Sequence, residues 1–204
     1  MFITFEGPEG CGKSTQAKRL KTYLEGLGRR VLLTFEPGGT QVGKEIRELL
    51  LKPESVLDDT TEVYLFAADR SEHVSKIVRP ALAEGKIVIC DRFIDSTLAY
   101  QIGGRRLPED LVRYLNMISS HGLVPDLTFL LDVTPATGLK RAAGKGAPDR
   151  FEQEALAFHQ RVRETYLQIA QDNHGRVIVV GTEDQTVDEA QAVIREKIDE
   201  KLRD

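Results

Sequence analysis

The sequence predicts an α/β protein of three layers, in which helices flank both faces of a five-stranded parallel sheet. Short apolar runs alternate along the chain with longer stretches of helical periodicity. The apolar runs lack the polar–apolar alternation of a strand that has one face in water, which is typical of strands buried on both faces. Such strand–helix units form parallel sheets that bind ligands at the carboxyl ends of their strands.

Each expected strand is a short segment rich in Val, Ile, Leu and Phe. Residues of these types favour the pleated, buried environment of a sheet. The expected strands are Phe2–Glu6, Val31–Phe35, Ile87–Asp91, Leu127–Asp132 and Val177–Val180.

The expected helices follow from apolar residues at helical spacing and from residues that begin or end helices. Gly28 suits the position just after a helix, and Pro108 suits a first helical turn. Pro80 should kink or interrupt the long third helix, because proline lacks the N–H group that a helix needs. The expected helices are Ser14–Leu27, Gly43–Leu51, Thr60–Glu84, Pro108–His121, Ala136–Ala143, Glu152–Asp172 and Val187–Leu202.

The composition is that of a globular protein, with 204 residues, 41% apolar and 29% charged, and we interpret residues 1–204 as one domain. A formal charge of −4 gives no support for a nucleic-acid partner. Cys11 and Cys90 suit a reducing compartment and lack the spacing of metal ligands. No run approaches ~18 apolar residues, and the N-terminus lacks the features of a signal peptide. We therefore expect a cytoplasmic protein with no membrane partner.

The segment GPEGCGKS, residues 7–14, matches the phosphate-loop motif G-x-x-x-x-G-K-[ST] between an expected strand and an expected helix. Glycines let backbone N–H groups converge on phosphate oxygens at a helix N-terminus. Lys13 would reach the β- and γ-phosphates of ATP, and the Ser14 hydroxyl would ligate Mg²⁺. A glycine-rich turn without a ligand is the alternative, and the context favours a P-loop NTPase fold. The expected nucleotide contacts in the loop are Gly7, Pro8, Glu9, Gly10, Cys11, Gly12, Lys13, Ser14 and Thr15.

Other sequence features separate the classes of phosphate-loop proteins. The chain lacks the N-K-x-D tetrapeptide of GTP switches, and its third expected strand ends in Asp91–Arg92 rather than the Asp-Glu of motor ATPases. A small-molecule kinase fits better, because its second anionic substrate needs arginines such as Arg47, Arg70 and Arg92. Each of these arginines taken alone is more often a solvated surface charge, but their placement just after strand ends favours a second anion site. The basic stretch Lys140–Arg150 suits a lid that closes over the donor phosphates.

Several short motifs in order resemble the thymidylate (dTMP) kinase family over nearly the whole chain. Each motif is weak alone, and their common order makes the signal specific. The motifs are FEGPEGCGKST at 5–15, EPGG at 36–39, FAADR at 66–70, DRFIDSTLAYQ at 91–101, PDL at 125–127 and DRFEQE at 149–154.

The resemblance implies a binding site for dTMP. Glu9 matches an acid that reaches the 3′-hydroxyl of the deoxyribose, Phe66 an aromatic that stacks on thymine, and Arg70 a reader of the base's exocyclic oxygen. Arg47 and Arg92 match residues that hold the acceptor phosphate, and Tyr100 would crowd a 2′-hydroxyl. The implied dTMP contacts are Glu9, Pro37 (expected in a cis peptide bond), Arg47, Phe66, Arg70, Arg92, Ser96, Tyr100 and Gln101.

The resemblance also implies residues that contact the donor ATP, Mg²⁺ as the cofactor, and a homodimer. Asp91 matches an acid near the metal ion, together with Ser14, and Arg141 matches a residue that packs on adenine. Gly10 stands where one subgroup has a basic residue, so the lid of this chain should supply the catalytic cation, with Lys145 at its centre and Arg141 and Arg150 at its flanks. The implied catalytic residues are Lys13, Arg92 and Lys145.

The resemblance therefore implies that the chain phosphorylates dTMP to dTDP with Mg–ATP, in the synthesis of dTTP for DNA. Another deoxynucleotide or deoxynucleoside kinase is the alternative enzyme, and a nucleotide-binding regulator without turnover is the alternative from another class. Apolar residues of the long third helix could serve a dimer interface or the core of one chain. They are Val63, Leu65, Val74 and Ile77.

Overall fold

A computed structural model describes residues 1–144 and 147–203 of the chain. Its sheet has five strands in the order β2-β3-β1-β4-β5, and all neighbouring strands are parallel. Each predicted strand is present, and only the last differs, because it extends one residue further to Gly181. The strands are β1 (Phe2–Glu6), β2 (Val31–Phe35), β3 (Ile87–Asp91), β4 (Leu127–Asp132) and β5 (Val177–Gly181).

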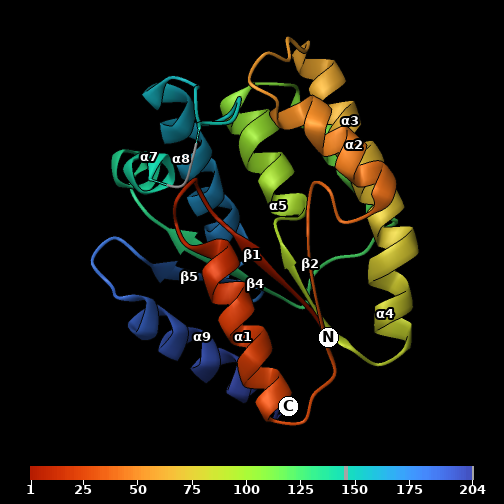
Figure 1. Cartoon of the computed structure of the whole chain (residues 1–204), viewed down its shortest axis with the longest axis vertical. Coiled ribbons are helices and arrows are strands. Elements are labelled where there is room, and N and C mark those ends of the chain that lie inside the picture. The colour runs from red at the N-terminus through yellow and green to blue at the C-terminus, as the bar shows by residue number, and fades with distance from the viewer. Residues whose placement is uncertain (145–146, 204) are drawn as a thin grey trace.

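Helices cover both faces of the sheet, as predicted (Figure 1). The α-helices are α1 (Lys13–Gly26), α2 (Gln41–Leu51), α3 (Asp59–His73), α4 (Arg79–Ala83), α5 (Ile94–Thr97), α6 (Glu109–Ser119), α7 (Pro135–Ala143), α8 (Leu156–Asp172) and α9 (Val187–Lys201). Two π-helical segments, η1 (Val74–Val78) and η2 (Leu98–Gly104), complete the set in the described part of the chain.

Alternate residues of the buried strands pack against different helices, as the two-residue period of a strand requires. Ile3 and Phe5 of β1 join the core beneath α1 and α9, whereas Phe2 joins a cluster with Val74 and Val78. Because β1 is the central strand, the loop that follows it emerges in the middle of the carboxyl edge of the sheet. The fold therefore places the phosphate-loop motif between the loops that follow β3 and β4.

The predicted helix Thr60–Glu84 is not one continuous α-helix in the structure. Residues 59–83 form α3, the π-helical turn η1 and α4 in succession, and Pro80 lies in the first turn of α4. A proline ring collides with the carbonyl group four residues before it, which here belongs to Lys76 in the wider turn. The interruption therefore precedes the proline rather than lying at it.

Residues 94–104 form α5 and η2, which the sequence analysis did not predict. This segment packs on α8, and Arg161 donates hydrogen bonds to the carbonyl groups of Gly103 and Gly104 at 3.0 and 2.9 Å. Contacts from α8, which is distant in the sequence, therefore stabilise a helical conformation that the local helix propensity of residues 94–104 does not indicate. The predicted start of α8 at Glu152 was also wrong, since the helix begins at Leu156 after a turn in which Asp149 accepts the Phe151 and Glu152 amides.

Candidate active site

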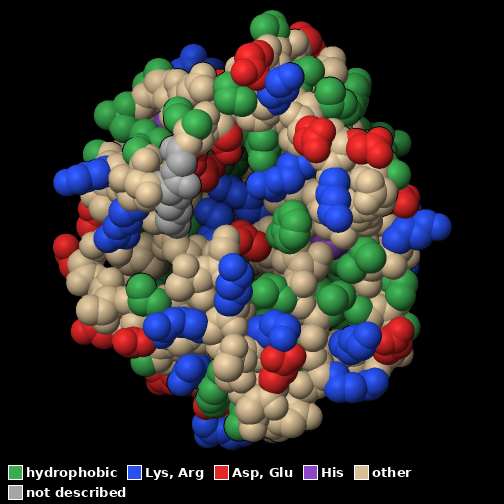
Figure 2. All heavy atoms as spheres, in the orientation of Figure 1, with side chains coloured by type: hydrophobic (Ala, Val, Ile, Leu, Met, Phe, Trp, Pro, Cys, Tyr) green, Lys and Arg blue, Asp and Glu red, His purple; other side chains and the backbone are tan. Residues whose placement is uncertain are grey.

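A cavity of about 680 Å³ opens at the carboxyl edge of the sheet. Figure 2 shows the hollow in this face, with Lys and Arg side chains at its floor. Most of the predicted site residues line it, which brings together segments far apart in the sequence. These residues are Glu9, Gly10, Gly12, Lys13, Ser14, Thr15, Pro37, Arg47, Phe66, Arg70, Asp91, Arg92, Ser96, Tyr100 and Gln101.

The phosphate loop folds tightly around the Lys13 side chain. The Lys13 ammonium donates to the carbonyl groups of Gly7 and Pro8 at 3.0 and 2.8 Å. Gly10 has a φ of 66°, and a side chain there would overlap the Gly138 carbonyl oxygen of α7. Because α7 packs closely on the loop, position 10 has no room for the basic residue that one subgroup of the family carries there.

Ser14 and Asp91 place two hard oxygen donors side by side at the start of α1 and the end of β3. The Ser14 hydroxyl donates a hydrogen bond to Asp91 Oδ2. Among the described residues, no three His, Cys, Asp or Glu side chains gather into a metal-binding group. The protein thus offers a small oxygen donor set, of the kind that leaves most positions of an octahedral cation to water and phosphate oxygens.

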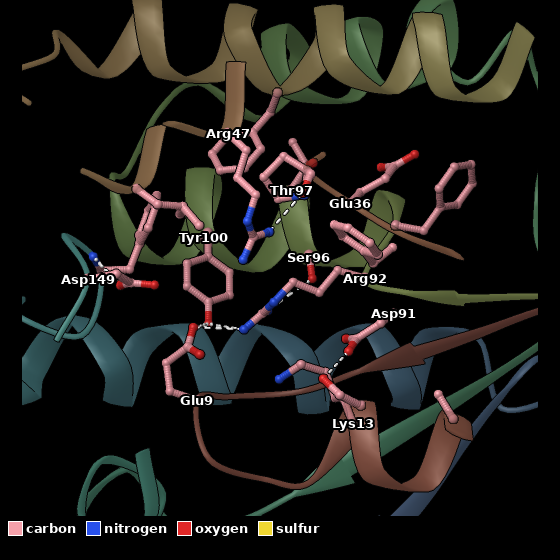
Figure 3. A pocket seen from close by; sticks show the side chains of 18 of the residues that line it. Glu9, Lys13, Glu36, Arg47, Asp91, Arg92, Ser96, Thr97, Tyr100 and Asp149 are labelled. Carbon is pink, nitrogen blue, oxygen red and sulfur yellow. Dashed lines mark hydrogen bonds and ion pairs between the residues drawn. The ribbon is translucent and has the colours of Figure 1, made fainter. Parts of the chain in front are cut away.

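Arg92 lies at the centre of a polar network in the cavity (Figure 3). Its guanidinium donates to Glu9 Oε1 at 2.7 Å, Tyr100 Oη at 3.2 Å and Ser96 Oγ at 3.2 Å. Burial alone would raise the pKa of Glu9, but the charges of Arg92 and Lys13 outweigh it and lower this pKa to about 2. Glu9 is therefore ionised and points toward Arg92 and Tyr100.

Arg47 faces the same space from α2. It donates to the Pro37 carbonyl at 2.8 Å, and its guanidinium carbon lies 5.6 Å from the Phe35 ring centroid. The Glu36–Pro37 peptide bond is cis, as predicted. Burial and the positive charge of Arg92 lower the pKa of Arg47. Two guanidinium groups that repel each other in a partly buried space favour a bound anion between them.

Phe66 and Arg70 are four residues apart, so they lie on one face of α3, and both line the cavity. The Phe66 ring lies 5.9 Å from the ring of Phe151. The Arg70 side chain is almost fully buried and donates to Glu36, Asn116 and the Phe93 carbonyl at 2.7–3.0 Å. Each terminal nitrogen of its guanidinium uses one hydrogen in these bonds, so each keeps a second donor.

The two arginines at the flanks of the predicted lid, Arg141 and Arg150, lie outside the cavity. Arg141 donates to the carbonyl groups of Thr182 and Glu183, both at 2.9 Å. Arg150 donates to the Leu50 carbonyl and pairs with Glu62 at 2.6 Å. Neither side chain lines the cavity, and Lys145 lies outside the described residues. Their predicted roles toward ATP stay predictions.

Some residues that line the cavity were not predicted from the sequence. Thr97, Asp149 and Phe151 contribute to its wall. Thr97 directly follows the predicted Ser96, and the other two belong to a motif that carried the family resemblance without an assigned role. The position of Phe151 depends on the turn before α8, which the sequence pattern did not predict.

None of the helices in residues 1–144 and 147–203 is long and apolar enough to span a bilayer. Val63 and Val74 of the long helical segment are fully buried within the chain. These two residues therefore belong to the core of one chain, and a dimer interface would need other apolar residues.

Comparisons with known proteins agree with this geometry. A family model for thymidylate kinase matches residues 5–194. A thymidylate kinase from Maridesulfovibrio salexigens is 47% identical, with 100% of this chain and 97% of the relative covered, and one from Gloeobacter violaceus is 51% identical over 87% and 84%. The crystal structure of thymidylate kinase from Ehrlichia chaffeensis has a TM-score of 0.81 and 37% identity, with 98% of each chain covered. Because these matches extend over most or all of its length, the chain belongs to the thymidylate kinase family.

Proposed function

We propose that this chain transfers the γ-phosphoryl group of ATP to dTMP, with Mg²⁺, and releases ADP and dTDP. The observation that carries the proposal is a single cavity that holds a phosphate loop, a pair of arginines and an aromatic pocket. A kinase for a nucleoside monophosphate needs these three parts, one for the donor, one for the acceptor phosphate and one for the base. The names of the relatives support dTMP as the acceptor.

The donor half consists of the phosphate loop and the N-terminus of α1. Backbone N–H groups of the loop and the Lys13 ammonium would hold the β- and γ-phosphates. Lys13 already lies along the loop, 7% exposed, so it needs only to exchange the Gly7 and Pro8 carbonyl oxygens for phosphate oxygens. Arg141 would pack on adenine and Lys145 would supply the lid cation, as the family implies.

The acceptor half is built around Arg92 and Arg47. Their guanidinium groups would hold the dTMP phosphate in line with the γ-phosphate, while Glu9 and Tyr100 take the deoxyribose. Phe66 would stack on thymine, with Arg70, Ser96 and Gln101 around the base. The contacts of Glu9 with Arg92 and Tyr100, which are proposed for the acceptor, support its assignment to the same side.

The hydroxyl of Ser14 and the carboxylate of Asp91 fit Mg²⁺, since they are adjacent hard oxygen donors. When bound, Mg²⁺ would neutralise charge on the donor phosphates. The acceptor phosphate oxygen is itself a nucleophile, so no side chain needs to act as a general base. The side chains of the chain act by alignment and by charge: Lys13, Arg47 and Arg92 each offer a cation to the reacting phosphates.

We also propose a cytoplasmic homodimer. The two free cysteines, Cys11 and Cys90, match a reducing compartment. Exposed apolar side chains on α6 and α3 support self-association. They are Tyr64, Tyr114, Met117 and Ile118, each 45–58% exposed.

An acceptor screen tests the proposed function. Purified protein with Mg–ATP is given dTMP, dUMP, thymidine, AMP or CMP, and ADP release and the phosphorylated product are measured. We expect dTMP to have the highest kcat/KM. Faster turnover of thymidine would instead support a deoxynucleoside kinase, and no ADP release with any acceptor would support a nucleotide-binding regulator.

A further inference from the structure

Glu62 of α3 is a fully buried carboxylate, with 0% exposure, beside the acceptor pocket. Its Oε1 accepts from Gln101 Nε2 at 2.8 Å and from Arg105 Nε at 3.1 Å. Its Oε2 accepts from Arg105 Nη2 at 3.0 Å and pairs with Arg150 Nη2 at 2.6 Å. Two guanidinium groups therefore hold the Glu62 carboxylate in one orientation. In this orientation, its Oε1 is free to accept a further hydrogen bond from the Gln101 amide.

The bond from Glu62 fixes which way the Gln101 amide points. A carboxylate between two guanidinium groups accepts hydrogen bonds and has none to donate, so only the NH₂ end of the amide can face it. The carbonyl oxygen of Gln101 is then on the other side. This Oε1 is buried and has no hydrogen-bond partner among the described residues, and Gln101 lines the cavity.

A buried acceptor without a partner favours an occupant that brings an N–H donor. Thymine and uracil carry an N–H at ring position 3, whereas cytosine carries a lone pair at the same position. With dTMP as the substrate, the ring N–H is the one donor of the base that can satisfy Gln101 Oε1. Cytosine in the same pose would set a lone pair against an oxygen.

We propose that Glu62 is a positioning residue for pyrimidine specificity, because it presents Gln101 to the base as a hydrogen-bond acceptor and so selects imide pyrimidines over cytosine. The inference rests on the proposed function. It concerns the imide edge and not the 5-methyl group, so it accounts for discrimination against dCMP and not for any preference between dTMP and dUMP.

The test compares kcat/KM for dTMP, dUMP and dCMP in the wild type and in Glu62→Gln. A glutamine at 62 can donate or accept, so the Gln101 amide is free to turn and offer its NH₂ to cytosine. We expect the dTMP:dCMP ratio to fall about 10- to 100-fold, the range for a lost buried hydrogen bond, while the dTMP:dUMP ratio stays within twofold. A variant that is merely loosened would lower all three values in parallel and leave both ratios unchanged.

Matched variants separate the roles. Glu154→Gln is the control, because Glu154 also binds Arg105 but is not bonded to Gln101, and its ratios should equal those of the wild type. Gln101→Met removes the acceptor and keeps the Glu62–arginine cluster, so its dTMP:dCMP ratio should fall as in Glu62→Gln. If Glu62→Gln does not fold by circular dichroism, Glu62→Asp keeps a carboxylate for the arginines while withdrawing it from Gln101, and a smaller fall is expected.

The outcomes are distinct. An unchanged dTMP:dCMP ratio in folded Gln101→Met, or in the folded Glu62 variant, overturns the inference while dTMP turnover by the wild type leaves the proposed function standing. Failure of the wild type to phosphorylate dTMP would instead remove the proposed function on which the inference rests.

Discussion

Glu9 of the phosphate loop and Arg92 of the loop after β3 form an ion pair, with Arg92 Nη2 2.7 Å from Glu9 Oε1. Tyr100 Oη donates to the same carboxylate oxygen at 2.6 Å. Arg92 also has a φ of 72°, a left-handed backbone conformation that non-glycine residues seldom adopt. The pair thus joins the loop expected to hold the donor to the residues expected to hold the acceptor, and it accounts for an acid within a phosphate-binding loop.

Replacement of Arg92 by alanine should nearly abolish turnover. The Arg92 guanidinium lines the cavity beside the phosphate loop and would stabilise charge on the reacting phosphates, and arginine contacts of this kind are worth ~10³–10⁵ in rate. We expect kcat to fall at least ~10³-fold in steady-state assays, while the affinity for ATP, measured by titration, changes little. Arg113→Ala on the surface of α6, where Arg113 pairs only with Glu109 in the described contacts, is the control. A near-normal kcat would show that Arg92 has another role.

Glu9→Gln should impair the use of dTMP and spare ATP. Glutamine keeps the shape of the side chain but removes the negative charge of the carboxylate, which accepts hydrogen bonds from Arg92 and Tyr100. The loss of a charge-assisted hydrogen bond costs about 1.5–3 kcal/mol, so KM for dTMP should rise roughly 10- to 100-fold. Isothermal titration with a non-hydrolysable ATP analogue should give an affinity within about threefold of the wild type. An equal loss of affinity for ATP would place Glu9 on the donor side.

The strands and the phosphate loop could be predicted from the sequence because their signals are local. A buried parallel strand such as β3 needs only a run of apolar residues, and the glycine positions of the loop follow from backbone geometry. The π-helical segments could not be predicted this way. η2 depends on Arg161, which lies in α8, so its stability comes from a partner more than 50 residues away.

The candidate site also contains some residues that could be predicted from local sequence signals and others that could not. Arg47, Arg92 and Glu9 belong to motifs at strand ends, where topology alone brings side chains together. Glu62 gave no such signal, because an acid in the first turn of a helix is ordinarily a solvated charge. Its importance depends on Arg105 and Arg150, which come from separate parts of the chain and meet only in the fold.

Met117→Glu should convert the proposed dimer into monomers. Tyr114, Met117 and Ile118 lie at i, i+3 and i+4 on α6, and all are about half exposed. A buried, unpaired carboxylate at an apolar interface costs several kcal/mol, which exceeds what most interfaces tolerate. Light scattering should give the mass of two chains for the wild type and of one chain for the variant. Val56→Glu, at a residue 98% exposed, is the control, and a wild type that is monomeric at micromolar concentration would contradict the proposal.

Glu6 is a fully buried acid directly before the phosphate loop. Its carboxyl accepts from the Phe93 amide at 2.8 Å and from Ser96 Oγ at 2.5 Å. Burial, assisted by the negative charge of Asp95, raises the pKa of Glu6 from 4.5 to about 7. The folded chain therefore holds a proton at Glu6 over a pH range in which the unfolded chain has released it.

Linkage fixes the sign of the effect on stability. Where the folded state binds more protons than the unfolded state, the free energy of unfolding falls as the pH rises. The stabilisation associated with Glu6 is therefore fully present below about pH 4.5 and is lost as the pH rises through about 7. A shift of this size corresponds to up to about 3 kcal/mol, and Asp69, whose pKa burial raises to about 6, adds a contribution of the same sign.

Glu6→Gln removes one of these two titrations and keeps the shape of the side chain. Urea unfolding of both proteins at pH 5, 6, 7 and 8 should show the free energy of unfolding of the wild type falling more steeply than that of the variant, so that the variant gains up to about 3 kcal/mol relative to the wild type across the series. Glu109→Gln, at an exposed residue of α6, should follow the wild-type curve. Parallel curves for Glu6→Gln and the wild type would mean that Glu6 has the same pKa in both states, because Arg92 and the hydrogen bonds to the Glu6 carboxyl stabilise its charge about as much as burial opposes it.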